Sequence, residues 1–539
     1  MSLLGTIDWF FIALYFVIVF GVAWWVTKRQ RATESATGYF LAGRDTGWFV
    51  VGASLFASNI GSEHLVGLAG TGAASGVAVG QFEVLASLIL LLLGWVFVPF
   101  YLKSGVFTMP EFLERRYSKG ARRYLAWISI IGYVLTKISV TVVAGGIVFE
   151  SLMGIDFWTG ALVVVVATGI YTVLGGLTAV LYTDMIQMFV LVGGSVIVMV
   201  TGLQAVGGWD VMVTTAGPAF MDMWKPMSDP TFPWTGIVFG APILGVWYWC
   251  TDQFIVQRVL AAKNVTEARR ATIFAGFLKL LPVFIFVIPG VIAYVLVQQG
   301  RLELAQADQA LPTLIGALLP AGMRGIVVAG LLAALMSSLS SVFNSCSTLI
   351  TWDVYKELKP DAPDRHLVWV GQISTVVLVG LALLWIPLMD AISEQIYTYL
   401  QSVQAYISPP IAAVFLLGIL WRRVNARGAM ASLLTGFVLG MGRLVAELNQ
   451  DALSGWLHTF ATINFLHFAI ALFVVCTVVL VGVSLTAPAP PREKLRDLTF
   501  GELSPSPEAT VERRGRRVNV LLSVLLALAV AAIWIYFSG

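Results

Sequence analysis

Ionisable and polar side chains interrupt the apolar segments of this sequence at a few positions. Asn59, Glu63 and His64 occur together inside "GASLFASNIGSEHLVGLAG". Glu83 lies in "VGQFEVLASLILLLLGW", and Lys279 lies in "GFLKLLPVFIFVIPG". A charge inside a membrane span costs roughly 2.5 to 3.5 kcal/mol even on the gentler scales, so such residues are candidates for a functional site.

Each of these polar residues also has a purely structural interpretation. Lys279 could extend to the membrane surface, because it is less than two turns from a basic loop. Glu83 could mark an exposed helix start, and His64 could be a packing histidine. Gln401, in "YTYLQSVQAYISPP", could hydrogen-bond a neighbouring helix. The residues alone leave both interpretations open.

The segment "LLAALMSSLSSVFNSCSTL" has the pattern of an ion site. On a helix, Ala334, Ser337 and Ser338 place one carbonyl region and two hydroxyls on a single face. Neutral oxygen ligands suit a monovalent cation that must enter and leave. Free carbonyls from a helix break near residues 57–60 would complete the set. Serine is also an ordinary small residue at helix interfaces, so packing alone explains the pattern equally well.

The composition indicates what kind of structural element carries these residues. Of the 539 residues 58% are hydrophobic and 12% charged, with a mean hydropathy of +0.86, whereas soluble domains carry roughly 25% charged residues. We therefore predict an all-α integral membrane protein with a single transmembrane domain, and we interpret the first apolar segment as a retained helix rather than a signal peptide. Apolar segments near the roughly 20-residue spanning length recur throughout. We count fourteen, centred near residues 17, 58, 90, 135, 164, 193, 243, 284, 338, 378, 407, 438, 474 and 528.

Lysine and arginine collect in alternate loops, and the loops between them carry mostly acidic residues. By the positive-inside rule the basic loops are cytoplasmic, which places both termini outside and requires an even number of helices. The basic residues are Lys28, Arg29, Arg31, Lys103, Arg115, Arg116, Lys119, Arg122, Arg123, Arg258, Lys263, Arg269, Arg270, Arg422, Arg423, Arg427 and those between Arg492 and Arg517.

Two predicted spans contain glycine, proline and polar clusters that favour a broken helix: the second, near residue 58, and the seventh, "FGAPILGVWYWCTDQ". Irregular backbone at membrane depth is tolerated where it is buried or lines a cavity. The two spans are five helices apart, so they have opposite orientations, as the leading helices of two inverted five-helix units should. Substrate and coupling ion would then bind near the membrane midplane, at these breaks.

The remaining motifs exclude other functions. Cys250, Cys346 and Cys476 fall within predicted helices, so a disulfide framework is not expected. The sequence contains no nucleophile elbow, phosphate loop or zinc motif, and we predict that the protein is not an enzyme.

Five segments together resemble the sodium/glucose cotransporters of the solute:sodium symporter family: "GASLFASNIGSEHLVGLAGTGAASG", "YTVLGGLTAVLYTDMIQ", "WYWCTDQFIVQRVLAAKN", "LLAALMSSLSSVFNS" and "YISPPIAAVFLLGILWRRVN". The resemblance runs from about residue 20 to 485. It implies fourteen transmembrane helices with the five-plus-five inverted-repeat core of the amino-acid/sodium symporter fold, working by alternating access. The implied parts are a peripheral helix at 5–27, inverted repeats at 47–205 and 232–418, and peripheral C-terminal helices at 428–537 that include a cytoplasmic loop at 487–517.

The resemblance also implies a set of site residues. Tyr248 would lie against the pyranose face as the inner gate, and Trp249 would frame the pocket. Sugar hydroxyls would be held by Asn59, His64, Glu83, Lys279 and Gln401, which together supply hydrogen-bond donors and acceptors. Sodium would bind the carbonyls of Ala57, Ile60 and Ala334 and the hydroxyls of Ser337 and Ser338. A second sodium in some members is associated with Asp184 and Ser340, and the outer gate with Leu68, Phe82 and Tyr397.

We therefore expect sodium-coupled symport of a sugar, such as glucose or galactose, with Na⁺, the sugar and the lipid bilayer as partners and neither a protein partner nor nucleic acid required. Gly245 and Gln404 stand where animal glucose carriers have other residues, which leaves the identity of the hexose open. The sequence also lacks the cysteine-rich insertion of the animal proteins, which favours a bacterial plasma membrane. The alternatives are a carrier of another polyol or organic solute, such as myo-inositol or sialic acid, and a sugar sensor that does not accumulate its ligand. Glu83 argues against a carboxylated substrate.

Overall fold

The computed structural model describes residues 4–30, 35–385, 396–504 and 509–538, and this part of the chain is helical with two isolated β-bridges. The all-α class is confirmed. The first half contains α1 (Thr6–Gln30), α2 (Ala36–Leu41), α3 (Trp48–Asn59), α4 (Ser62–Ser75), α5 (Gly80–Leu92), α6 (Val98–Ser104), α7 (Met109–Arg116), α8 (Lys119–Gly132), α9 (Ser139–Val148), α10 (Phe157–Val206), α11 (Trp209–Ala216) and α12 (Pro218–Met221). The second half contains α13 (Ala241–Gly245), α14 (Gln253–Leu260), α15 (Val265–Leu278), α16 (Ile288–Gln298), α17 (Ala310–Leu318), α18 (Met323–Leu349), α19 (Lys356–Leu358), α20 (Asp364–Trp385), α21 (Ile396–Leu420), α22 (Ala426–Leu448), α23 (Gly455–Thr462), α24 (Phe465–Thr486) and α25 (Ala509–Tyr536).

Wider π-helical turns interrupt many of the long helices. Such turns are uncommon and occur frequently at functional sites. The ones used below are η4 (Tyr133–Ile138) and η7 (Val246–Thr251); the others are η3 (Leu93–Phe97), η5 (Phe149–Met153), η6 (Gly236–Gly240), η8 (Val283–Val287) and η10 (Ile350–Tyr355).

Eleven helices in the described residues are long and apolar enough to cross a membrane, which differs from the fourteen spans expected. The helix breaks account for part of the difference, because Trp48–Asn59 and Gly236–Thr251 are too short to qualify. The 50-residue α10 covers two expected spans in one bent helix. Its bend is at Gly176, where φ is 55° and a Cβ would lie 2.5 Å from the carbonyl oxygen of Tyr39, so glycine is required.

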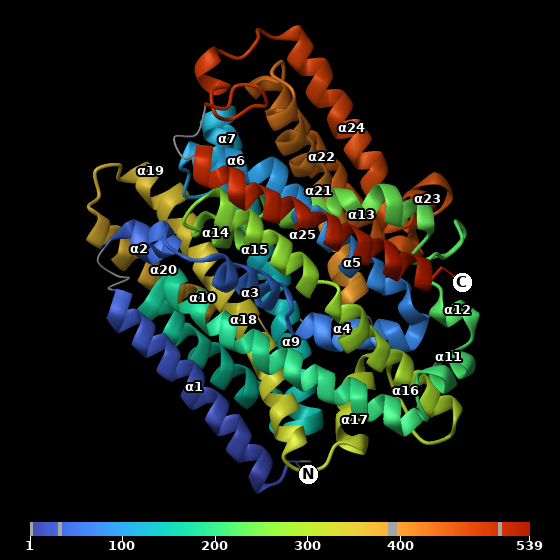
Figure 1. The fold of residues 1–539 in the computed structure, drawn as a ribbon. Helices are drawn as coiled ribbons and strands as arrows, with labels where there is room; N and C mark the ends of the chain where they lie inside the picture. The colour runs from blue at the N-terminus through green and yellow to red at the C-terminus, as the bar shows by residue number, and fades with distance from the viewer. Residues whose placement is uncertain (1–3, 31–34, 386–395, 505–508, 539) are drawn as a thin grey trace.

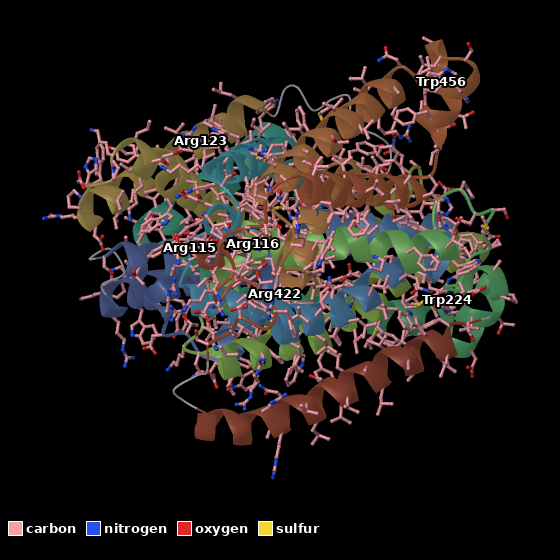
Figure 2. The ribbon with its side chains drawn as sticks, turned by 90° about the horizontal axis from the view of Figure 1, so that it is seen from above. Arg115, Arg116, Arg123, Trp224, Arg422 and Trp456 are labelled. Carbon is pink, nitrogen blue, oxygen red and sulfur yellow. The ribbon has the colours of Figure 1, made fainter. Side chains whose placement is uncertain are left out.

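The helices surround α18, which packs along α10 near the middle of the molecule (Figure 1). In the most apolar window of its span 94% of residues are buried, against 17% for the window in α25. α25 lies along one edge in the view from above (Figure 2). Large apolar side chains of α25, including Leu521 and Leu528, are exposed, as expected for a helix that faces lipid.

The peripheral helix α1 is tied to the central helix by one carboxylate. Asp8 is fully buried, and its Oδ1 accepts hydrogen bonds of 2.7 Å from the amides of both Gly322 and Gly325 at the start of α18. A carboxylate satisfies unpaired amides and complements the positive end of the helix dipole there.

Two arginines assigned to basic loops lie inside the protein instead, which corrects the sequence interpretation. Arg116 is 1% exposed and donates to the carbonyls of Gly418, Trp421 and Val424, where α21 ends and leaves carbonyls unpaired. Arg258 is fully buried in α14. Arg115, Arg123 and Arg422 remain accessible to solvent (Figure 2).

Candidate functional site

Both predicted helix breaks are present. α3 ends at Asn59, and the amide of Gly61 donates to the carbonyl of Asn59 instead of continuing the helix. Ile60, between α3 and α4, has φ −84° and ψ 89°. The second break is at Asp252, which has extended backbone between η7 and α14 and caps α14 by accepting a hydrogen bond from the amide of Phe254 at 3.2 Å.

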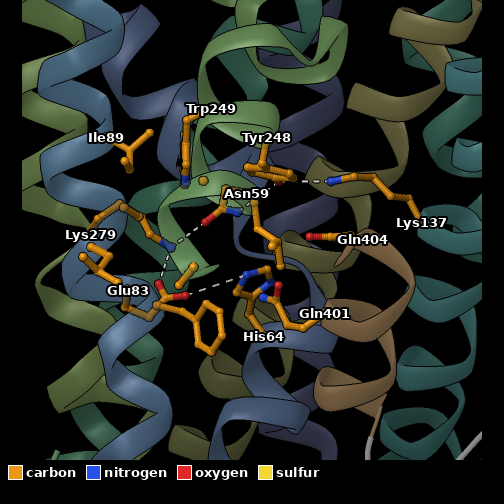
Figure 3. A pocket seen from close by; sticks show the side chains of 16 residues that line it. Asn59, His64, Glu83, Ile89, Lys137, Tyr248, Trp249, Lys279, Gln401 and Gln404 are labelled. Carbon is orange, nitrogen blue, oxygen red and sulfur yellow. Dashed lines mark hydrogen bonds and ion pairs between the residues drawn. The ribbon is translucent and has the colours of Figure 1, made fainter. Parts of the chain in front are cut away.

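The breaks adjoin a buried cavity of about 60 Å³ between α3, α4, α5, η4, η7 and α21 (Figure 3). All seven residues predicted to contact the sugar line it: Asn59, His64, Glu83, Tyr248, Trp249, Lys279 and Gln401. Gln404 and Gly245, the two positions that depart from the animal glucose carriers, also line it.

Two charged groups of this cavity, Lys279 and Glu83, are paired with each other. Lys279 is 1% exposed and Glu83 is 2% exposed, so neither lies at the membrane surface. Lys279 Nζ forms an ion pair with Glu83 and donates to Asn59 Oδ1 at 2.5 Å. His64 Nε2 lies 3.9 Å from Glu83 Oε1. Buried charges require such partners, because an isolated ion in a dry interior loses its hydration without compensation.

Tyr248 extends this hydrogen-bond network to Lys137, a residue that sequence reasoning missed. Its hydroxyl oxygen accepts hydrogen bonds of 3.0 Å from Asn59 Nδ2 and from Lys137 Nζ. Lys137 is 8% exposed and lies on η4, across the cavity from Lys279 (Figure 3). The signal was available, because Lys137 is a charge inside the predicted span centred near residue 135.

The cavity is small for a sugar. Pockets for small ligands are typically about 300 Å³ or larger, against about 60 Å³ here. Side chains must therefore move apart to admit a pyranose. Its hydroxyls would exchange with the hydrogen bonds that Asn59, Glu83, Lys279 and Tyr248 now make to one another, so net affinity depends on differences between similar interactions.

The predicted sodium ligands lie where α18 meets the end of α3. Ala57, Ile60 and Ala334 are buried there. Ser338 Oγ donates to the carbonyl of Ser58 at 3.3 Å, whereas Ser337 Oγ donates to Asp184 Oδ1 at 2.6 Å. The two hydroxyls therefore have different acceptors, one at the helix break and one on α10.

Asp184 is the centre of a second oxygen-rich cluster. Its Oδ2 accepts hydrogen bonds from Ser54 at 2.5 Å and Ser58 at 3.0 Å, and Arg258 Nε lies 3.9 Å away. Sequence reasoning missed these three partners, although Ser54 and Ser58 are four residues apart and so share a face of α3. Ser340 Oγ donates within α18, to the carbonyl of Ser337 at 3.0 Å. Asp184 and the predicted sodium ligand Ser337 are thus in direct contact.

The predicted outer gate is described only in part. Leu68 is fully buried, and Phe82 lines the cavity. The ring centroid of Phe82 lies 6.0 Å from that of Phe232 and 6.5 Å from that of Phe465. The side chains of Tyr397 and Glu63 lie outside the described residues.

Comparison with known proteins identifies the family. Residues 39–436 match the sodium:solute symporter family. The chain belongs to this family. The symporter is 40% identical over 551 residues to the sodium/myo-inositol cotransporter of Canis lupus familiaris, covering 93% of this chain and 76% of that protein. It is also 40% identical over 519 residues to sodium/glucose cotransporter 1 of Ovis aries, covering 88% and 78%.

Solved structures show the same fold. A Na⁺-coupled sialic acid symporter in a substrate-bound outward-open state matches with a TM-score of 0.77 and 23% identity, over 90% of this chain and 99% of that chain. A nucleobase-cation-symport-1 family transporter in a closed conformation matches with a TM-score of 0.53 and 14% identity, over 85% and 97%. Family membership confirms the expected multi-pass membrane symporter with sodium as the coupling ion.

Proposed function

We propose that this symporter uses sodium entry to accumulate a sugar, with a hexose such as glucose or galactose as its substrate, by alternating access. The observation that carries the proposal is the cavity at the two helix breaks, lined by all seven residues expected to bind a sugar. Its paired acceptors and donors match neutral hydroxyls, which can both donate and accept. The similarity to sodium/glucose cotransporter 1 supports the same substrate class.

A second candidate substrate is myo-inositol, because cotransporters of that polyol are equally similar to this chain. The cavity wall near Gly245 is expected to affect whether a hexose or myo-inositol is preferred. A Cβ at this position would lie 3.0 Å from Ile89 Cγ1, closer than an ordinary contact, so a larger residue would displace the Ile89 side chain and reshape the cavity wall. Gly245 and Gln404 are therefore the positions at which we expect substrate preference to be set.

The architecture we propose has fourteen spans. α3 with α4 forms one broken span, residues 236–260 form another, and α10 is divided at Gly176 into two. Inverted repeats would cover 47–205 and 232–418, with the breaks at Ile60 and Asp252 in corresponding leading helices. An even number of spans places both termini on the same side, and cytoplasmic basic loops make that side the outside of a plasma membrane, for which we propose a bacterial one.

Uptake into proteoliposomes tests the function. We expect labelled glucose or galactose to accumulate above equilibrium under an inward sodium gradient and to stop accumulating when an ionophore dissipates it. Myo-inositol and sialic acid should be tested in parallel, since accumulation of either instead of a hexose would change the substrate assignment. Sodium-dependent sugar binding without accumulation would identify a sensor and contradict the transport proposal.

A further inference from the structure

We infer that Lys137 is a positioning residue that holds the inner gate closed by clamping the two sides of the broken helix at Asp252. The inference rests on the proposed function, because it assigns Tyr248 to the gate. Lys137 lies on a different element from both groups that it contacts, the π-helical turn η4.

The contacts of Lys137 straddle the break. Its Nζ lies 3.0 Å from the hydroxyl oxygen of Tyr248 and 4.1 Å from the centroid of that ring, on the η7 side of Asp252. The same Nζ lies 4.0 Å from the centroid of the Phe254 ring, on the α14 side. The two ring centroids are 6.3 Å apart. One ammonium group thus contacts both segments that would have to separate when the gate opens.

These contacts of Lys137 are strong enough to favour the closed state of the gate. A desolvated cation over an aromatic face and a charge-assisted hydrogen bond each exceed an ordinary neutral hydrogen bond. The hydroxyl of Tyr248 is also held from the opposite side by Asn59, which accepts a hydrogen bond from Lys279. A sugar that binds Lys279 and Glu83 would compete for that second support and leave the contact with Lys137 in place (Figure 3).

Loss of the Lys137 charge should have a measurable effect on the coupling of sodium to sugar transport. Without the Lys137 ammonium, the Tyr248 hydroxyl would lose a charge-assisted hydrogen bond and the two segments would lose their shared contact, so the gate would open more often without sugar and let sodium pass uncoupled. The variant Lys137→Met keeps a side chain of similar length but removes the charge. In proteoliposomes we expect it to raise sodium leak in the absence of sugar about tenfold, the factor that corresponds to about 1.4 kcal/mol, and to lower the sugar-to-sodium ratio.

The cysteines provide a readout that does not depend on transport. Cys250, Cys346 and Cys476 are all buried and unpaired, and Cys250 lies two residues from Tyr248 on η7. We expect Lys137→Met to increase the rate at which a small maleimide labels Cys250, measured by mass spectrometry of the intact chain, by about tenfold, on the same energetic argument. Labelling of Cys346 and Cys476 should not change, whereas general loosening of the fold would expose all three.

Two further variants sharpen the test. Lys137→Arg keeps the charge and should restore most coupling, and Lys263→Met, at a half-exposed lysine paired with Asp45, should behave as the parent does. Parent-like leak and Cys250 labelling in Lys137→Met would overturn the inference, as would equal labelling of all three cysteines. Failure of the parent itself to accumulate sugar would instead contradict the proposed function, because the labelling measurement does not require transport.

Discussion

At the residue scale, Gln401 tests the placement of the sugar. Its side chain is half-buried in the cavity wall, opposite the Glu83–Lys279 pair. Gln401→Ala should weaken hexose binding by roughly 1 to 3 kcal/mol, because the sugar hydroxyl that it contacts would be left without a partner. The dissociation constant can be measured by calorimetry on the purified protein.

Gln299→Ala is the matched control for Gln401, because this amide lies outside the cavity and donates to the carbonyl of Val206. An unchanged dissociation constant in Gln401→Ala would show that Gln401 does not contact the sugar.

Two substitutions at Tyr248 distinguish the role of its aromatic ring from the role of its hydroxyl. Tyr248→Ala removes the surface that would stack on a pyranose and also removes the gate, so sugar binding and coupled accumulation should both be lost. Tyr248→Phe keeps the ring and its contact with the Lys137 ammonium but loses the hydroxyl, so most sugar binding should remain and coupled accumulation should fall less than in Tyr248→Ala. Initial uptake rates and accumulation ratios measure the two effects. Equal damage from the two substitutions would assign the function to the hydroxyl.

Sequence reasoning selected the charged residues of this cavity because charge is rare in apolar segments, whereas the roles of Tyr248 and Trp249 came from the resemblance to the sodium/glucose cotransporters. Glu83 and Lys279 lie in runs that would otherwise be uninterrupted. Arg258 was placed in a loop because it precedes a basic loop along the chain, yet it lies on α14, which is buried along its whole length after the break at Asp252. Periodicity does not report where a short helix goes after a break, since that depends on contacts with distant helices.

At the element scale, the close approach of α4 and α16 is expected to be sensitive to one methyl group. A Cβ at Gly290 would lie 2.0 Å from the carbonyl oxygen of Ala69, on rigid backbone. Gly290→Ala should therefore force these helices apart and destabilise the protein by about 1 to 3 kcal/mol or more. Thermal unfolding in detergent should show a lower Tm.

Gly193→Ala is the control for this packing, because its Cβ would meet nothing within 4 Å in the middle of α10. Alanine there should raise stability by about 0.4 to 1 kcal/mol through loss of backbone freedom in the unfolded chain. If Gly290→Ala unfolds at the same temperature as Gly193→Ala, the two helices do not pack as closely as described.

Glycine and polar clusters in apolar segments predicted both helix breaks, but they did not predict the π-helical turns. Lys137 and Tyr248 each lie on such a turn, which carries one extra residue and rotates the side chains that follow. A hydrophobic pattern read at 3.6 residues per turn does not reveal that rotation. The contact between Lys137 and Tyr248 was therefore beyond sequence reasoning, although the unusual lysine was not.

At the scale of the whole molecule, the proposed sodium ligands predict which ion gradient drives transport. Carbonyls and hydroxyls do not titrate near neutral pH, so mild external acidification at fixed sodium should not replace sodium. Ser337→Ala with Ser338→Ala should raise the sodium concentration for half-maximal uptake at least about tenfold, since two charge–dipole ligands are lost. Sugar binding at saturating sodium should change less.

Ser347→Ala controls for the loss of a serine from α18, because its hydroxyl donates to the carbonyl of Gly371 instead. Asp184 enters the test as well, since this carboxylate contacts Ser337 directly. Sugar accumulation driven by a pH gradient in sodium-free buffer would contradict the ligand assignment, and Asp184 and Glu83 would then be the groups to examine as proton carriers.

The buried carboxylate of Asp8 also limits when the first helix can pack against the central one during synthesis. Asp8 is separated by 314 positions from Gly322, whose amide it binds. At roughly 5 to 20 residues per second, a ribosome needs about 15 to 60 seconds to synthesise the intervening chain. During that time α1 sits in the bilayer without the helix that it will cap, so its contact with α18 forms only after more than half of the chain has been synthesised. The first span can therefore pack against α10 during synthesis before the central helix that it caps is present.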